Sequence, residues 1–165
     1  MRRVTAILSV AAVVLMAADL LAQAKPSFAG EWKIAADPAA DGGGRAGSPG
    51  IDLTITQSAN AMTVEYRAGG QTPAPVKLTY KLDGSVSKNM VAGRSGGAPA
   101  EQVSKAMWAG NNVVVTTTTG AAEEKRTFTM EGGNLVVETS APPRGGGAAN
   151  VTKVTYKKYE RGFGG

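Results

Sequence analysis

The sequence predicts an all-β protein, an up-and-down antiparallel β-barrel of about 8–10 strands. Three observations predict this fold. Apolar and polar residues alternate with a period of two along most of the chain, and helical periodicity is missing from the same segments. Gly, Asn, Asp and Pro separate the alternating segments. Short and long connections follow one another in turn, as expected of a barrel with one closed and one open end.

The first 24 residues are predicted to be a signal peptide, outside the folded domain. Arg2 and Arg3 precede the apolar run Val4–Ala18, and Ala22-Gln23-Ala24 is a small-residue cleavage site. The apolar run is shorter than the roughly 20 residues of a membrane-spanning helix, which disfavours the alternative of an uncleaved anchor. We therefore expect residues 25–165 to form one domain in the periplasm or outside the cell, without stable membrane insertion.

Composition narrows the classes of partner. The chain has no cysteine, which excludes disulfides and a lipid-modified N-terminal cysteine. Removal of Arg2, Arg3 and Asp19 with the signal peptide reduces the 18 basic and 13 acidic residues to 16 and 12, a net charge of +4. The basic residues are scattered and form no run interleaved with aromatics, so no nucleic-acid binding is predicted. A mild positive charge favours solubility and the attraction of small anions or anionic surfaces.

The first strand is predicted around the segment Phe28-Ala29-Gly30-Glu31-Trp32-Lys33. Phe28, Trp32 and Ile34 share one face with Gly30, and a glycine two residues before a tryptophan lets the backbone approach the ring closely. Nine further segments bring the total to about ten strands, most of them with clear alternation. In order they are Ile51–Ile55, Met62–Tyr66, Val76–Leu82, the weaker Ser85–Val91, a run ending at Trp108, Val113–Thr119, Lys125–Met130, Leu135–Ser140 and Val151–Glu160.

The connections predict which end of the barrel is open. Every second connection is a tight turn in which Gly, Asn or Asp supplies a positive φ, namely Ser58–Asn60, Asp83–Gly84, Gly110–Asn111 and Glu131–Gly133. The others are mostly long and rich in Gly and Pro, namely Asp37–Gly50, Ala68–Pro75, Gly93–Ala100, the shorter Gly120–Ala122, and Ala141–Asn150. Alternate connections of an up-and-down sheet lie at opposite ends. The tight turns are therefore predicted to close a floor, and the long loops to surround a mouth.

Strand direction then predicts the height of each inward side chain. The floor is predicted to be structural, with Trp32, Trp108 and Gly30 beside an apolar plug of Met62, Leu82, Val113, Met130 and Leu135. Nearer the mouth, the predicted ligand-binding residues are Arg126, Tyr66, Thr117, Thr119, Phe128 and Thr139. An inward arginine can bind a carboxylate or a phosphate through two parallel hydrogen bonds.

Two alternatives stay open for the arginines. A one-residue bulge would reverse the strand faces and leave Arg126 as an ordinary solvated residue. Arg45, Arg94 and Arg144 lie in Gly-rich mouth loops, where they form either a cationic collar or solubilising positions in flexible segments.

Short motifs resemble the calycin superfamily of lipocalins and fatty-acid-binding proteins. FAGEWKI resembles its G-x-W first strand, and MWAGNNVVVTTTT with RTFTMEGGNLVVETS resembles paired hairpins of the fatty-acid-binding proteins. VTKVTYKKYE resembles their closing strand, and the layout, including TYKLDG, is most similar to bacterial secreted lipocalin-like domains. The resemblance implies a barrel in which Trp32 has a structural place.

The chain also departs from these families. Fatty-acid-binding proteins have a helical lid between the first two strands, whereas Asp37–Gly50 is Gly-rich and has no apolar periodicity. The arginine that clamps the fatty-acid carboxylate in their closing strand is Val154 here, two residues before Tyr156. The motif that lipocalins carry in their third inter-strand loop is missing. Fatty-acid specificity is therefore not implied.

Residues typical of catalysis are scarce. The chain has neither histidine nor cysteine, which removes imidazole acid–base chemistry, thiol nucleophiles and His-ligated zinc or haem. The sequence predicts a turn at Glu123-Glu124 in which these carboxylates form a solvated cluster with Lys125 and Arg126. We expect a protein that is not an enzyme and has no cofactor or metal. Two functions remain: a barrel that carries a small, partly apolar and possibly anionic molecule, or an envelope protein-interaction or inhibitor module with a filled barrel and its mouth loops as the contact surface.

Overall fold

The computed structural model describes residues 24–35, 52–67, 75–91, 98–119, 122–143 and 148–160, and these ranges contain ten strands and no helix. The all-β prediction is confirmed. The strands are β1 (Gly30–Ile34), β2 (Asp52–Gln57), β3 (Ala61–Arg67), β4 (Pro75–Lys81), β5 (Asp83–Val91), β6 (Ala100–Ala109), β7 (Asn112–Thr119), β8 (Ala122–Glu131), β9 (Asn134–Ala141) and β10 (Asn150–Lys158).

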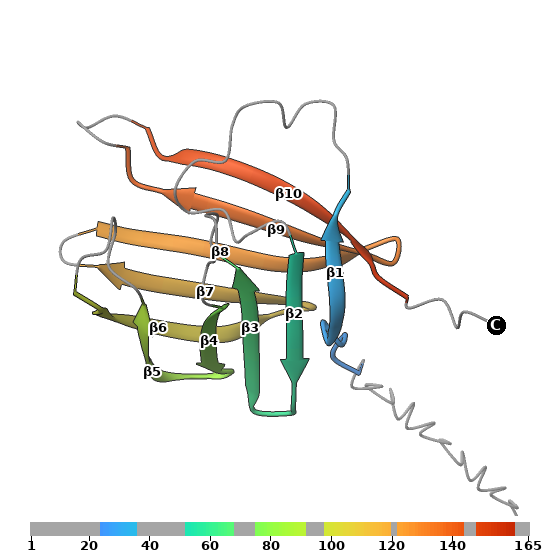
Figure 1. Cartoon of the computed structure of the whole chain (residues 1–165), viewed down its shortest axis with the longest axis horizontal. Coiled ribbons are helices and arrows are strands. Elements are labelled where there is room, and N and C mark those ends of the chain that lie inside the picture. The colour runs from blue at the N-terminus through green and yellow to red at the C-terminus, as the bar shows by residue number, and fades with distance from the viewer. Residues whose placement is uncertain are drawn as a thin grey trace, which may run out of the picture.

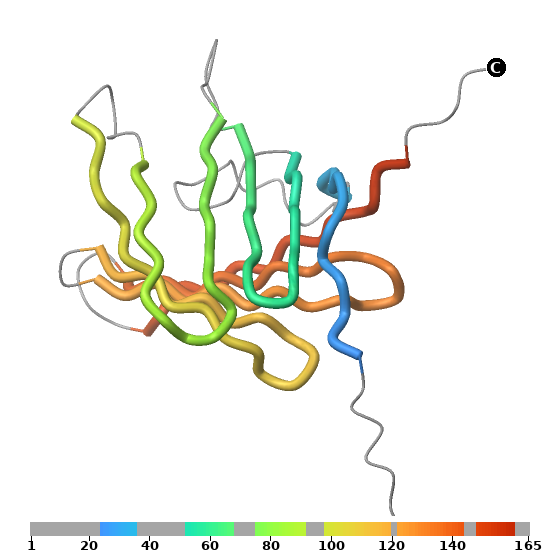
Figure 2. The backbone as a smooth tube through the Cα atoms, turned by 90° about the horizontal axis from the view of Figure 1, so that it is seen from below, coloured from blue at the N-terminus to red at the C-terminus, as the bar shows by residue number. Residues whose placement is uncertain are grey.

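The ten strands form one antiparallel sheet that bends round into a nearly closed barrel. Its order is β4-β3-β2-β1-β10-β9-β8-β7-β6-β5, so every strand except β4 and β5 pairs with a neighbour on both sides. Pairing between β1 and β10 joins the two halves of the chain. Figure 1 shows β1–β4 standing across the longer strands β6–β10, and Figure 2 shows the same two walls from below. The side chains between these walls form the interior.

Side chains hold together the last gap, between β4 and β5. No backbone ladder is present between the described residues of these two strands. Instead, the backbone N–H of Thr79 donates to Asn89 Oδ1 at 2.8 Å, and Asn89 Nδ2 donates to the Thr79 carbonyl at 3.1 Å. The backbone N–H of Lys81 donates to Ser87 Oγ at 2.9 Å. Asn89 and Ser87 are both buried, so two polar side chains satisfy a strand edge that a neighbouring backbone would otherwise satisfy.

The tight turns lie where the sequence predicts them, with one difference in detail. β2 and β3 are joined by residues 58–60, β6 and β7 by residues 110–111, and β8 and β9 by residues 132–133, with Gly110, Gly132 and Gly133 at positive φ. The predicted turn Asp83–Gly84 belongs instead to β5. The chain turns at Leu82, and the ladder with β6 shifts its register between Asp83 and Val86, with Gly84 at φ 82°. Most of the long connections, with Arg45, Arg94 and Arg144, lie outside the described residues.

The core fills the floor, and the residues just before β1 contribute to it. The Phe28 side chain is fully buried, stacks on Trp108 at 5.9 Å between ring centroids, and meets Phe128 edge-on at 6.4 Å. Trp32 Nε1 donates to the Phe28 carbonyl at 2.8 Å. The Gln57 side chain accepts from the Phe28 N–H at 2.7 Å and donates to the Pro26 carbonyl at 3.2 Å. The segment thus closes the barrel at its tight-turn end.

Gly30 allows the close approach that the sequence predicts. Its φ is +150°, and a Cβ atom there would lie 3.2 Å from Lys158 Cε and 3.5 Å from Trp32 Nε1. Both the backbone angle and the lack of space favour glycine. Trp32 is 1% exposed and Trp108 is partly buried against the core at the same end of the barrel.

Candidate functional site

Polar side chains replace the apolar core at the end of the barrel away from the tight turns. Ser104, Thr117 and Thr139 are 1%, 5% and 8% exposed, and each lies two residues from a buried apolar residue on its own strand. The hydroxyl groups of Ser104 and Thr117 are 2.9 Å apart and share a hydrogen bond across the β6–β7 pair. A buried hydroxyl without a hydrogen-bond partner lowers the stability of a fold, and here the two hydroxyls satisfy each other. The interior is therefore polar at this level.

Arg126 lies inside this polar level. Its side chain is 11% exposed, and Arg126 Nε lies 2.6 Å from Glu124 Oε1, in an ion pair between residues two apart on β8. The ladders place Thr117 opposite Glu124 and Thr139 opposite Arg126. The Arg126 side chain therefore lies on the inner face of β8, whose ladders show no register shift, and its role in ligand binding stays a prediction.

Glu124 corrects the sequence prediction. The sequence predicts a turn at Glu123-Glu124 and a strand from Lys125, but β8 begins at Ala122, so Glu123 and Glu124 already alternate across the strand. Glu123 and Lys125 are exposed, whereas the Glu124 side chain is 24% exposed and lies on the inner face beside Arg126. Extending the alternation of Arg126, Phe128 and Met130 two residues upstream would have placed Glu124 inside.

The Glu124–Arg126 pair supplies the charge of the described interior. Every described Lys, Arg, Asp and Glu is exposed except Glu31, Glu124 and Arg126. Glu31 lies on β1 between Gly30 and Trp32, so its side chain is on the face opposite the inward Trp32. The interior of the described barrel therefore carries one positive and one negative charge in contact with one another.

Two buried tyrosines lie within electrostatic reach of Arg126. Burial raises the pKa of Tyr80 to about 12, while the charge of Arg126 opposes this rise, and Tyr66 and Glu124 add to it. Burial also raises the pKa of Tyr156 well above its usual value, again opposed by Arg126. Tyr80 lies on β4 and Tyr156 on β10, so Arg126 acts on one tyrosine from each of two walls of the barrel. Both hydroxyl groups are neutral at physiological pH.

Two buried polar atoms of the inner face have no hydrogen-bond partner among the described residues. They are the hydroxyl oxygen of Tyr156, on a residue that is 0% exposed, and Oε1 of Gln102, two residues before Ser104 on the same face of β6. The predicted site residues do not include Tyr80, Tyr156, Ser104 or Gln102. Alternation alone could have found Tyr80, because it shares a face with Leu78 and Leu82.

The structure brings some of the predicted ligand-binding residues together and separates others. Arg126, Thr117 and Thr139 are adjacent across the β7–β8–β9 ladders, and half-buried Tyr66 lies between Leu53 and Val76 on the opposite wall. Thr119 was expected inside but is exposed, because it is the last residue of β7, at the barrel rim. Phe128 is inward, as expected, but packs with Phe28 in the floor core. A role in ligand binding stays a prediction for all six residues.

Two clefts on the described surface lie away from this polar level. One, of about 370 Å³, lies at the floor and is lined by Lys25, Ser27, Gln57, Ser58, Ala59 and Trp108. The other, of about 350 Å³, lies along β1 and β2 beside Tyr159. The described residues include no group of three or more acidic side chains that could hold a metal ion. Nor does any helix among them have the length and apolar character needed to cross a bilayer.

Comparison with known proteins identifies the fold. No protein-family model matches the chain, and no curated protein does. The structure is similar to that of a mutant of the fluorescent protein UnaG, with a TM-score of 0.58 and 24% identity over 81% of this chain and 97% of the other. It is also similar to a secretory abundant heat soluble protein from Ramazzottius varieornatus, with a TM-score of 0.54 and 13% identity over 80% and 95% of the two chains. These similarities show a calycin-like barrel.

Proposed function

We propose that this protein is a secreted, non-enzymatic barrel that binds a small, partly apolar molecule in its upper interior. The observation that carries the proposal is the inward, partly buried Arg126–Glu124 pair, set among hydroxyl groups above an apolar floor. Apolar residues that fill the same volume usually stabilise a fold as well as an ion pair in the interior does, or better. The stability of the fold therefore does not explain this pair, whereas ligand binding does. A polar lining at one level of an apolar interior is what a site needs to orient a ligand.

The site offers apolar contact on one side and hydrogen bonds on the other. Val115 and Ala106 are buried one step below Thr117 and Ser104 on β7 and β6 and can contact the apolar part of a ligand. The guanidinium of Arg126 can donate hydrogen bonds, and the carboxylate of Glu124 can accept them. The ligand thus lies with its polar group toward the mouth.

The same side chains are poorly suited to catalysis. The Ser104 hydroxyl pairs with the Thr117 hydroxyl rather than with a base that could activate it. The raised pKa of Tyr80 keeps its hydroxyl protonated at neutral pH, so it cannot act as a general base there. Binding without chemistry is therefore the function that these groups support.

The predicted signal peptide supports a place in the periplasm or outside the cell. The short apolar run and the Ala22-Gln23-Ala24 site support cleavage after Ala24. Together with the FAGEWKI segment, they support a kinship with bacterial secreted lipocalin-like domains. N-terminal sequencing of the protein from the envelope fraction tests this step, and a chain beginning at Met1 would contradict it.

Native mass spectrometry tests the binding function. Protein purified without denaturation from its own envelope extract is expected to carry a small adduct that denaturation releases. Arg126→Met is expected to reduce the adduct, because Arg126 is inside, whereas Lys125→Met removes the same charge from the outer face of β8 and should leave the adduct unchanged. Adduct-free protein from the native extract would contradict the proposal.

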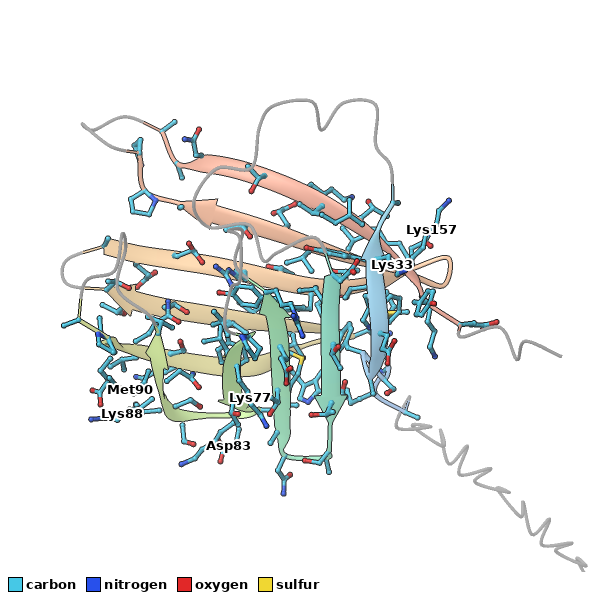
Figure 3. All side chains as sticks on the ribbon, viewed as in Figure 1. Lys33, Lys77, Asp83, Lys88, Met90 and Lys157 are labelled. Carbon is cyan, nitrogen blue, oxygen red and sulfur yellow. The ribbon has the colours of Figure 1, made fainter. Side chains whose placement is uncertain are left out.

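One observation favours the second function, a protein-interaction module. Met90 and Met107 are 63% and 54% exposed, and Val86 is 41% exposed on the same pair of strands, β5 and β6. Figure 3 shows Met90 and Lys88 projecting from the barrel near β5. All three lie on the outer face of this strand pair, where exposed apolar side chains can contribute to a protein interface. A stoichiometric protein partner without a small adduct, in the same native spectra, would favour this function.

A further inference from the structure

We infer that the upper interior accepts a ligand whose polar group is uncharged or zwitterionic and discriminates against anions, because Glu124 is a built-in counter-ion for Arg126. The inference rests on the proposed function and specifies the ligand class of the same site. The sequence predicts an anionic partner for Arg126, but that prediction did not include Glu124 on the inner face. The inference therefore replaces it.

The first step is the charge balance of the interior. Arg126 Nε and Glu124 Oε1 are 2.6 Å apart, and the two side chains are 11% and 24% exposed. The other described charged residue that is not exposed, Glu31, is on the outer face of β1. The described interior therefore has no net charge before a ligand enters.

The second step is the effect of adding a charge. An anionic group near Arg126 would share the guanidinium with Glu124, and the three groups together would carry a net negative charge in a poorly solvated space. Like charges within a few ångström of each other strongly disfavour their common ionisation, and burial adds to this effect. A cation near Glu124 meets the opposite imbalance. A net-neutral group enters without either penalty.

The third step is the set of hydrogen-bond groups that the barrel interior offers to a ligand. The Tyr156 hydroxyl can donate or accept, the Gln102 Oε1 atom can only accept, and both atoms are buried with no partner among the described residues. Glu124 adds an acceptor and Arg126 adds donors. The site thus offers donors and acceptors together, as suits a neutral group with both an N–H or O–H and a carbonyl oxygen, or a zwitterion.

Two fluorescent probes of matched shape test the inference. N-phenyl-1-naphthylamine is neutral, and 8-anilinonaphthalene-1-sulfonate carries one negative charge on a similar aromatic frame. The purified protein is expected to bind the neutral probe at least about tenfold more tightly, and Glu124→Gln should shift the ratio of affinities about tenfold or more toward the sulfonate. Mutual displacement of the probes establishes that they share a site. Titration at two salt concentrations separates attraction to the cationic surface from binding inside.

Glu123→Gln is the matched control. It removes the same charge from the neighbouring residue, which is exposed on the outer face of β8. The ratio of the two affinities should therefore stay at the value of the unchanged protein. Circular dichroism melts verify that each variant is folded. The ratio of the two affinities in the unchanged protein tests the inference without any variant.

The outcomes separate this inference from the proposed function. If the unchanged protein prefers the sulfonate, or if Glu124→Gln moves the ratio no more than Glu123→Gln does, the inference is overturned while probe binding still supports a ligand-binding barrel. If neither probe binds and native spectra show no adduct, the proposed function fails, and the inference fails with it.

Discussion

Glu123 and Glu124 are adjacent residues with the same chemistry, and the two faces of β8 give them different environments. Alternation with Phe128 and Met130 continues through Arg126 and so predicts an inward side chain there. Glu124 was not predicted to be inside, because the sequence was interpreted as a turn where the strand had already begun. Thr119 shows a different error. It lies on the same face of β7 as Thr117, but it is the last residue of the strand, beyond the buried part of the barrel. Alternation predicts a face, and the depth along the barrel decides whether that face is buried.

Trp32 tests the floor at the residue scale. Its side chain is 1% exposed, and its indole N–H donates to the Phe28 carbonyl. Trp32→Ala should lower the free energy of unfolding by about 3–5 kcal/mol, the range for deletion of a buried aromatic side chain. Urea melts measure this change, with Lys157→Ala, an exposed position on β10, as the control. Agreement of the Trp32→Ala and parent melts within about 1 kcal/mol would contradict a structural floor at Trp32.

The buried hydroxyl of Tyr80 makes the free energy of unfolding depend on pH in the alkaline range. Burial raises the pKa of Tyr80 from 10.0 to about 12 in the folded protein. Below pH 10 the Tyr80 hydroxyl keeps its proton in both the folded and the unfolded chain, so the free energy of unfolding does not depend on its titration. Between pH 10 and 12 the unfolded chain loses the proton first, so stability falls by about 1.4 kcal/mol per pH unit for each such tyrosine.

Urea melts from pH 8 to 11.5 measure that slope. Tyr80→Phe removes the titrating hydroxyl and should make the decline shallower, whereas the same change at Tyr159, which is exposed, should leave it as it was. An equal slope in the parent and in Tyr80→Phe would show that Tyr80 does not titrate as a buried group.

At the scale of elements, the strand order and the turns follow from local patterns, whereas the seam between β4 and β5 does not. Its backbone groups are satisfied by Asn89 and Ser87, which in the sequence look like ordinary polar residues of a weak strand. Nothing in their spacing distinguishes a side chain that faces the next strand from one that faces water. The seam depends on a contact between strand edges, so the sequence alone could not predict it.

Asn89→Ala tests the seam. The substitution removes two hydrogen bonds to the Thr79 backbone and leaves part of the β4 edge unsatisfied. We expect a loss of about 1–3 kcal/mol in the free energy of unfolding. Faster hydrogen exchange at the Thr79 amide should accompany this loss. Lys88→Ala, on the exposed face of β5, is the control, and unchanged exchange at Thr79 in Asn89→Ala would mean that the edge is protected by other groups.

At the scale of the whole molecule, the barrel separates a floor that stabilises the fold from an upper level that is polar. The floor was predictable because apolar alternation and tight turns both identify it. The composition of the upper level was only partly predictable, because it depends on which residues from opposite walls meet. Tyr80 on β4 and Tyr156 on β10 are far from Arg126 in the sequence, and closure of the barrel brings both within electrostatic reach of Arg126.

Because the floor stabilises the fold, we expect that the connection between β1 and β2 can be shortened with little loss of stability. Lys33 and Asp52 are already paired opposite each other, and β1 and β2 are joined by a four-residue ladder. Replacement of residues 37–50 by a four-residue turn should change the free energy of unfolding by less than about 1 kcal/mol, because the entropy of loop closure varies slowly with length. Urea melts of the shortened and parent chains measure the difference, with an equal-length Gly/Ser replacement of the same residues as the control for composition. A loss of several kcal/mol in both variants would show that residues 37–50 pack against the barrel and contribute to its stability.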